Sequence, residues 1–113
     1  MHEQSIVQSL LSVALENAER AQAVKIVSIN LVVGAYSGVL KEAVDLYFSF
    51  LSKNTIAEGA TIVYTHVPAK LRCRDCGAVF SPENLVYRCP ECHEPRVDIV
   101  AGRELYVDSL EVE

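Results

Sequence analysis

Four cysteines in two close pairs carry the clearest chemical pattern in this chain. Cys73 and Cys76 form one C-x2-C pair, and Cys89 and Cys92 form another after an interval of twelve residues. Two such pairs across a short loop are typical of a tetrahedral zinc site with four thiolate ligands. The alternatives are two disulfides or free thiols in a core. A chain without a secretory signal favours zinc, so we predict a structural Zn²⁺ on these four residues.

The residues around the cysteines suit tight turns. Gly77 tolerates a positive φ, and Pro90 has a fixed φ. His93 directly follows the last cysteine, and we interpret it as a turn residue beside the zinc, with an extra metal ligand as the alternative. Three arginines also lie near the cysteines in the sequence, at Arg72, Arg74 and Arg88. We interpret them as compensating the negative charge of the thiolates, with substrate recognition as the alternative.

The first three residues form a second candidate metal site. The terminal amine of Met1, the amide nitrogen of His2 and the His2 imidazole can close adjacent chelate rings on one ion, and the amide or carboxylate of Glu3 can supply a fourth donor. Such nitrogen-rich, near-planar sets suit Ni²⁺ or Cu²⁺ better than Zn²⁺. On the residues alone, however, an exposed terminal histidine is the commoner arrangement. We interpret His66 as a structural or surface residue of a strand.

Composition excludes several classes of protein. Half of the 113 residues are hydrophobic and the net charge is −5, so we expect a folded domain with a small metal-stapled insert. The acidic balance disfavours a general nucleic-acid binder. No stretch reaches the ~18 apolar residues of a membrane span, and the first residues do not resemble a signal peptide. We therefore expect a cytoplasmic protein with no nucleic-acid or membrane partner.

Hydrophobic periodicity predicts two amphipathic helices and three strands outside the cysteine segment. The expected order is helix 4–22, strand 25–33, helix 39–53, strand 60–68, zinc module 69–101 and strand 103–112. In the first helix the expected buried stripe consists of Ile6, Val7, Leu10, Leu11, Ala14, Leu15, Ala18 and Ala21. In the second helix it consists of Val39, Ala43, Leu46, Tyr47, Phe50 and Leu51. In the last strand, the apolar residues change phase between Val107 and Leu110, which predicts either a bulge or burial on both faces.

These elements predict an α+β fold, in which two helices pack on a three-stranded sheet with an inserted four-cysteine, zinc-ribbon-like module. We expect residues 1–68 to form the first part of a nickel-binding domain and residues 69–101 to form the zinc module. Residues 102–113 then return to the nickel-binding domain as its last strand.

Several features together resemble the HypA/HybF family of nickel metallochaperones. They are the initial Met1-His2-Glu3, the helix that follows, the Gly34-Ala35-Tyr36-Ser37 turn after a strand, and the two cysteine pairs, the second running into His93. The cysteine pattern alone is common among zinc ribbons. Its combination with Met-His-Glu at the start is specific, and the resemblance extends to the closing Leu110-Glu111-Val112 segment.

The resemblance implies a nickel cargo and a structural zinc. In that family one Ni²⁺ binds at the N-terminus through His2, with the terminal amine of Met1 and backbone nitrogens, and Glu3 influences the site. Zinc binds the four cysteines. The expected partners are the GTPase HypB and the [NiFe] hydrogenase large subunit, which receives the nickel. Some members also support urease maturation, and a homodimer stays open as an alternative to a monomer.

No nucleophile–base pair or pair of catalytic acids stands out, so we expect no catalysis by the chain itself. Two other functions remain as alternatives to nickel delivery. One is a zinc-ribbon interaction module in an RNA or transcription complex, which the acidic composition disfavours. The other is a thiol redox sensor, which would have to lose its zinc reversibly on oxidation.

Overall fold

The structure is a computed structural model that describes residues 2–82 and 87–113, and only the main chain of His2. The chain divides into two compact units. One takes in the chain up to Val32, together with Gly38–Thr65 and Tyr106–Glu113. The other consists of Val33–Ser37 and His66–Leu105. The chain therefore passes between the units four times, after Val32, Ser37, Thr65 and Leu105.

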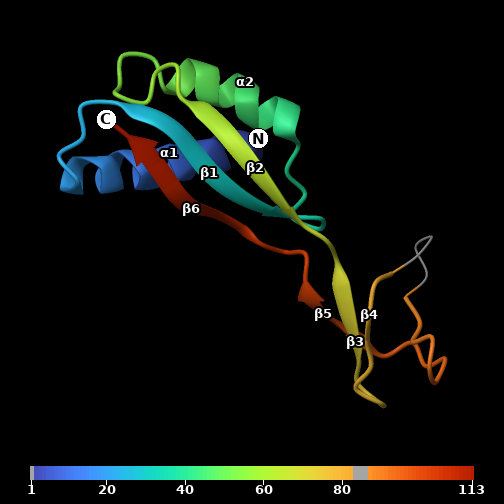
Figure 1. The fold of residues 1–113 in the computed structure, drawn as a ribbon. Helices are drawn as coiled ribbons and strands as arrows, with labels where there is room; N and C mark the ends of the chain where they lie inside the picture. The colour runs from blue at the N-terminus through green and yellow to red at the C-terminus, as the bar shows by residue number, and fades with distance from the viewer. Residues whose placement is uncertain (1, 83–86) are drawn as a thin grey trace. The chain divides into compact units, whose positions relative to one another are not determined.

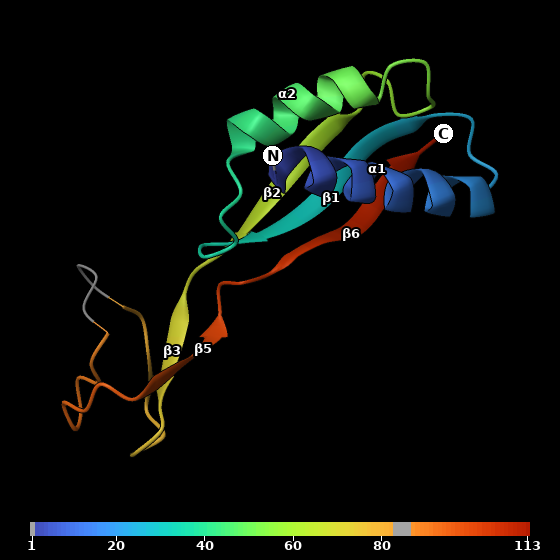
Figure 2. The same ribbon diagram turned by 180° about the vertical axis from the view of Figure 1, so that it is seen from behind.

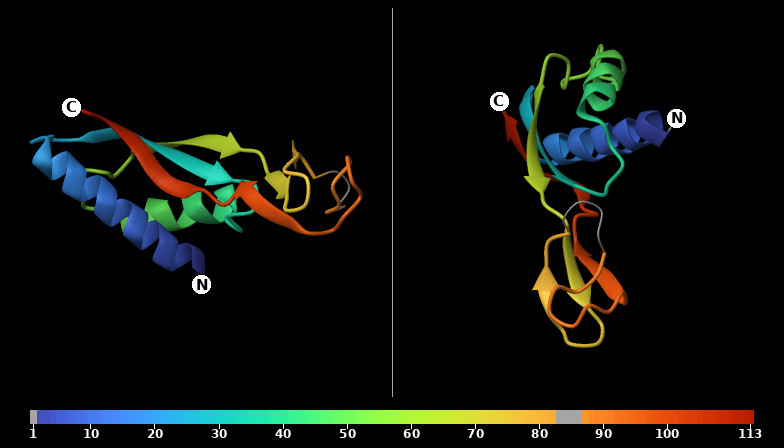
Figure 3. Two further views of the ribbon diagram at one scale, coloured as in Figure 1. Left: turned by 90° about the horizontal axis from the view of Figure 1, so that it is seen from below. Right: turned by 90° about the vertical axis from the view of Figure 1, so that its right-hand side faces the viewer.

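The first unit is a three-stranded sheet covered on one face by two helices. Its elements are α1 (His2–Arg20), β1 (Ile26–Gly34), α2 (Lys41–Leu51), β2 (Thr61–Val67) and β6 (Leu105–Val112). The strand order is β2-β1-β6, with β1 in the centre (Figure 1). Both helices lie on the same face of this sheet (Figures 2 and 3). The predicted α+β class is confirmed.

The central strand β1 has the sequence of a buried strand, and its residues Ile29, Leu31 and Val33 are buried. On one side β6 runs antiparallel to it, since the Glu113 N–H donates to the Lys25 carbonyl at 2.8 Å and the Gly34 N–H donates to the Glu104 carbonyl at 2.7 Å. On the other side β2 runs in the same direction as β1, and α2 makes the crossover between them (Figure 1).

Helix α1 begins two residues earlier than predicted and ends at Arg20. It ends because Gln22 takes a left-handed φ of 56°, and the Ala23 N–H then donates to the Ala18 carbonyl at 3.0 Å. Its buried residues fall on the predicted stripe and are Val7, Leu10, Leu11, Ala14 and Ala18. In the described part of the chain, no helix is long and apolar enough to cross a membrane.

The buried stripe predicted for α2 is wrong in phase. The structure buries Val44 and Phe48, while Leu46 is 56% and Phe50 is 60% exposed. The sequence of this helix is apolar on more than one face, so hydrophobic periodicity allows more than one rotation about the helix axis. Polar contacts with β2 select the rotation that is observed.

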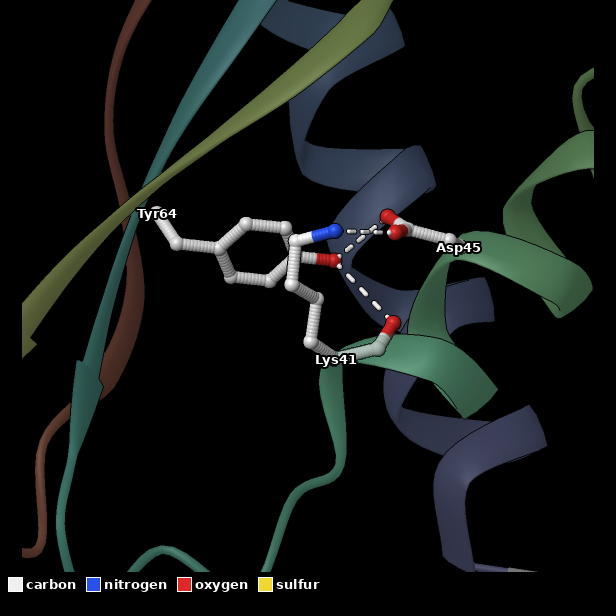
Figure 4. Close-up of polar contacts among 3 residues, drawn as sticks. All are labelled: Lys41, Asp45 and Tyr64. Atoms are coloured by element: carbon white, nitrogen blue, oxygen red, sulfur yellow. Dashed lines mark hydrogen bonds and ion pairs between the residues drawn. The ribbon is translucent and has the colours of Figure 1, made fainter.

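Those contacts join Lys41 and Asp45 of α2 to Tyr64 of β2 (Figure 4). The Tyr64 hydroxyl donates to Asp45 Oδ1 at 2.7 Å, and Lys41 Nζ donates to Asp45 Oδ2 at 2.9 Å. Burial and the nearby carboxylate of Asp45 raise the pKa of Tyr64, so its hydroxyl stays a donor. The face of α2 that carries Lys41 and Asp45 is therefore held against the sheet.

The phase change predicted in β6 is present in its burial pattern. The half-buried residues Leu105 and Val107 are two positions apart, but the next half-buried residue, Leu110, comes three positions later. Val107 and Leu110 are both half-buried, and both line a groove beside α1. Ser109, between them, lines the same groove, and its hydroxyl accepts a hydrogen bond from Asn30 Nδ2 at 2.7 Å. The burial pattern of β6 therefore changes phase between Val107 and Leu110, within a continuous strand.

The second unit contains three short strands, β3 (Lys70–Cys73), β4 (Val79–Phe80) and β5 (Val97–Ala101). They form an antiparallel sheet in the order β4-β3-β5. The turn at Val33–Ser37 also belongs to this unit, since the Ala35 N–H donates to the Val67 carbonyl at 2.9 Å and the Tyr36 N–H donates to the Gly102 carbonyl at 2.6 Å.

Replacing Gly34 with Ala should destabilise this turn by about 2–3 kcal/mol. A Cβ at Gly34 would lie 2.1 Å from the Gly102 oxygen and 2.7 Å from the Glu104 nitrogen, and main-chain atoms cannot rotate away. At Gly38, with a φ of +77°, a Cβ meets nothing within 4 Å, so Gly38→Ala should cost only the left-handed strain of about 1 kcal/mol. Denaturant unfolding of both metal-loaded variants would measure the difference. Equal losses would contradict the close approach at Gly34.

Replacing Tyr64 with Phe should lower the free energy of unfolding by about 1 kcal/mol at neutral pH. Burial opposes ionisation of Asp45, but hydrogen bonds from Lys41 and Tyr64 outweigh it and hold the pKa of Asp45 below its ordinary value. The stabilisation is therefore present above about pH 3.9 and is lost as the pH falls through the lowered pKa.

The loss caused by Tyr64→Phe should accordingly shrink in acid, and the Asp45 pKa measured by NMR should rise in the variant. Loss of metal at low pH affects both proteins and cancels in the difference. A loss of stability that is independent of pH would argue against the hydrogen bond to the carboxylate.

Candidate metal centre

The structure brings the four predicted cysteine ligands together. The Sγ atoms of Cys73, Cys76, Cys89 and Cys92 all lie within 4.8 Å of one another. The sulfurs of Cys73 and Cys92 are 3.5 Å apart, and those of Cys76 and Cys89 are 3.4 Å apart. A tetrahedral zinc with bonds of about 2.3 Å spaces its sulfurs by about 3.8 Å. The donor set and spacing are therefore compatible with Zn²⁺.

The two cysteine pairs sit on turns of the same form. In the first turn the Gly77 N–H donates to the Cys73 carbonyl at 3.0 Å, and in the second the His93 N–H donates to the Cys89 carbonyl at 2.8 Å. Gly77 and His93 occupy equivalent positions, each directly after the second cysteine of its pair. Both have a left-handed φ, 79° for Gly77 and 64° for His93. The structure thus places His93 in the turn position that we preferred for it.

Main-chain N–H groups point at the sulfurs and stabilise negative charge there. The Glu91 N–H lies 3.3 Å from the Cys89 sulfur. The N–H of Cys92, with help from that of Glu91, outweighs burial and lowers the pKa of Cys89 to about 7. At Cys92 the Glu94 N–H favours the thiolate, but the adjacent sulfur of Cys73 and burial outweigh it and raise the pKa to about 12. The close sulfurs therefore oppose ionisation of all four thiols, and a bound cation would favour it.

The charged residues near the cluster bind one another across the second unit. Arg74 pairs with Asp98 at 2.8 Å, and Arg96 donates two hydrogen bonds to the Asp75 carboxylate, the shorter at 2.8 Å. These pairs are largely exposed and contribute little stability each. The Arg74 guanidinium, interpreted as a counter-charge for the sulfurs, thus has the Asp98 carboxylate as its partner.

Sequence reasoning missed Asp75 and Asp98 as partners of these arginines. Asp75 lies between the first two cysteines, and Asp98 lies on β5, directly opposite Arg72 of β3. Alternating opposite charges beside the cysteines were visible in the sequence. The strand register that brings them together was not, because it depends on how β3 and β5 pair.

The predicted nickel ligands stand apart from this centre in the sequence, at the start of α1. Met1 and the His2 side chain lie outside the described residues, while Glu3 is a half-buried residue in the first turn of α1. The backbone of α1 is helical from His2 onward. The first N–H groups of any helix have no acceptor within the helix. Coordination by the His2 or Glu3 amide nitrogen would therefore break no helical hydrogen bond.

Comparisons with known proteins cover almost the whole chain. A family model described as HypA, a hydrogenase/urease nickel incorporation metallochaperone, matches residues 1–112. The hydrogenase maturation factor HypA of Dehalococcoides mccartyi strain CBDB1 is 44% identical, and the match covers 100% of this chain and 95% of the relative. That of Caldanaerobacter subterraneus subsp. tengcongensis is 40% identical, and the match covers 100% of both chains.

Solved structures agree in fold. The solution structure of a HypA protein has a TM-score of 0.78 and 32% identity, covering 100% of this chain and 97% of that one. The solution structure of the Ni metallochaperone HypA from Helicobacter pylori has a TM-score of 0.69 and 29% identity, covering 97% of this chain and 96% of that one. The chain therefore belongs to the HypA family of hydrogenase maturation nickel metallochaperones, which carry metal and are not enzymes.

Proposed function

We propose that this protein binds one Ni²⁺ at its N-terminus and delivers it to the [NiFe] hydrogenase large subunit, working with the GTPase HypB. The observation that carries the proposal is the family match, which begins at Met1 and therefore includes the Met1-His2-Glu3 start. The family description also names urease, so urease maturation proteins are further candidate partners. We place this delivery in the cytoplasm.

The nickel site in this proposal consists of the His2 imidazole, the Met1 terminal amine and a nitrogen or oxygen of Glu3. The helical start of α1 supports it, because the amides nearest the terminus are those that helix formation leaves without an acceptor. An open chelate of this kind can release its ion when a partner offers better ligands. A buried cage of ligands would hold the ion too firmly for delivery.

The four cysteines in this proposal hold a resident zinc whose role is structural. Thiolate ligands and a closed shell suit Zn²⁺, and no open position is left for a substrate. We propose that residues 69–101 form the zinc module, and that residues 1–68 and 102–113 form the nickel-binding domain around it. The turn at Val33–Ser37 belongs to the nickel-binding domain by its place in the sequence, although it packs within the second unit.

Replacing His2 with Ala should abolish nickel binding while zinc content and fold persist, because only the terminal chelate is lost. Nickel titration calorimetry and elemental analysis would measure both metals, with His66→Ala as a control that removes an imidazole from β2. Adding residues ahead of Met1 should also weaken nickel binding, since the terminal amine becomes an amide. Nickel affinity should decrease as the pH is lowered, because the nitrogen donors then take up protons. Unchanged nickel affinity in His2→Ala would overturn the proposed site.

Replacing His93 with Gly should leave zinc affinity intact or raise it by up to about fivefold, because glycine removes left-handed strain of about 1 kcal/mol. Competition with a zinc chelator would measure the affinity, and His93→Asn provides a control that also tolerates the left-handed region. A clear loss of zinc affinity in His93→Gly would identify His93 as a ligand after all.

A further inference from the structure

A groove between α1 and β6 takes no part in the proposed nickel and zinc chemistry. It encloses about 350 Å³, and both of its walls belong to the first unit. Val13 and Ala18 lie on the α1 side, and Val107, Leu110 and Val112 lie on the β6 side. The small side chain of Ala18 is buried, while Val13 is 44% and Val112 is 39% exposed. These apolar residues remain partly open to solvent, and Asn17, Asp108 and Ser109 line the groove beside them.

The β6 side of the groove is also the edge of the sheet. In the part of the chain that the structure describes, β1 is the one hydrogen-bonded neighbour of β6. Main-chain hydrogen bonds continue as far as Glu113. The Val24 N–H donates to the Glu113 carbonyl at 2.7 Å, and the Glu113 N–H donates to the Lys25 carbonyl. A fixed edge strand beside an apolar groove is the arrangement to which extended peptides bind in strand addition.

The charged residues of the edge strand are all acidic, and the basic residue beside them is Lys25, whose main chain pairs with that of Glu113. Residues 106–113 contain Asp108, Glu111 and Glu113 and no lysine or arginine. On α1, Arg20 pairs with Glu16 at 2.7 Å, so it does not neutralise the strand. A second copy of β6 would place like charges opposite one another, which destabilises a strand pair. The charge therefore disfavours self-association through β6 and favours a basic partner.

We propose that β6 and the groove beside α1 bind an extended segment of a partner protein, in which apolar residues alternate with lysine or arginine. The segment lies alongside β6 and pairs with its free main-chain edge. Its apolar side chains enter the groove between Val13 and Leu110, and its basic side chains lie near Asp108 and Glu113. This interaction needs no nickel, so it is tested separately from the proposed metal site.

The probe is a capped nine-residue peptide with Lys at odd positions and Val at even positions, titrated into the ¹⁵N-labelled, zinc-loaded full chain without nickel. We expect saturable NMR shifts confined to residues 13–21 and 107–113. A peptide with Ser in place of Val keeps the charge but lacks the apolar side chains, and a peptide with Glu in place of Lys reverses the charge. Both should bind far more weakly.

Two variants with matched controls locate the contact. Val13→Asp should weaken peptide binding by about tenfold, since it puts a charge on the groove wall. Val63→Asp, at a β2 residue that is 45% exposed and outside the groove, should not. Asp108→Lys should weaken peptide binding by roughly fivefold and reduce the salt dependence of the affinity. Glu42→Lys makes the same change of charge on α2 and should have little effect.

The proposal is overturned by absence of saturable binding, by equal binding of the Ser-substituted peptide, or by insensitivity to Val13→Asp. It is also overturned if the shifts centre on the exposed residues Leu46 and Phe50 of α2. Shifts in β6 that grow with protein concentration in the absence of peptide would show that a second copy occupies the edge.

Discussion

Four sulfurs within 4.8 Å of one another form the constraint on which the second unit depends. At that spacing thiolates repel, and the burial of Cys73 and Cys89 makes their charge harder to solvate. Directed N–H groups offset part of this cost, as the pKa of about 7 at Cys89 indicates. Apart from these two cysteines, Leu71 is the one buried hydrophobic residue in the described part of His66–Leu105. Even with Val33, which also belongs to this unit, the core is small, so we expect the unit to need a metal on its cysteines to stay folded.

The first unit rests on the packing of helices against a sheet. Its core is built from α1, α2 and the central strand β1, and the hydrogen bonds of Tyr64 and Lys41 to Asp45 hold α2 at one rotation. The first buried residues of α1 are Val7, Leu10 and Leu11, and they lie after its first turn. The two proposed sites thus differ in physical type. One is a closed set of sulfurs within a unit, and the other is a set of nitrogen donors at a chain end.

The sequence predicted those features that depend only on the spacing of residues along the chain. The cysteine pairs, the order of helices and strands, and the stripe of α1 follow from local periodicity, and the structure confirms them. The rotation of α2 could not be predicted, because its apolar residues fit two faces and a hydrogen bond from Tyr64, distant in sequence, selects one. The role of Gly34 could not be predicted for a similar reason. Its position requires a glycine because the main chain of Gly102, distant in sequence, lies too close for a Cβ. The pairing of Arg74 with Asp98 likewise depends on strand register.

The central claim is that the two metals occupy separate sites with different donors. X-ray absorption at the nickel and zinc edges of the doubly loaded protein tests it most directly. The account predicts four sulfur neighbours around zinc at about 2.3 Å and a near-planar nickel shell made of nitrogen and oxygen alone. Sulfur in the nickel shell, or a zinc shell with fewer than four sulfurs, would contradict it.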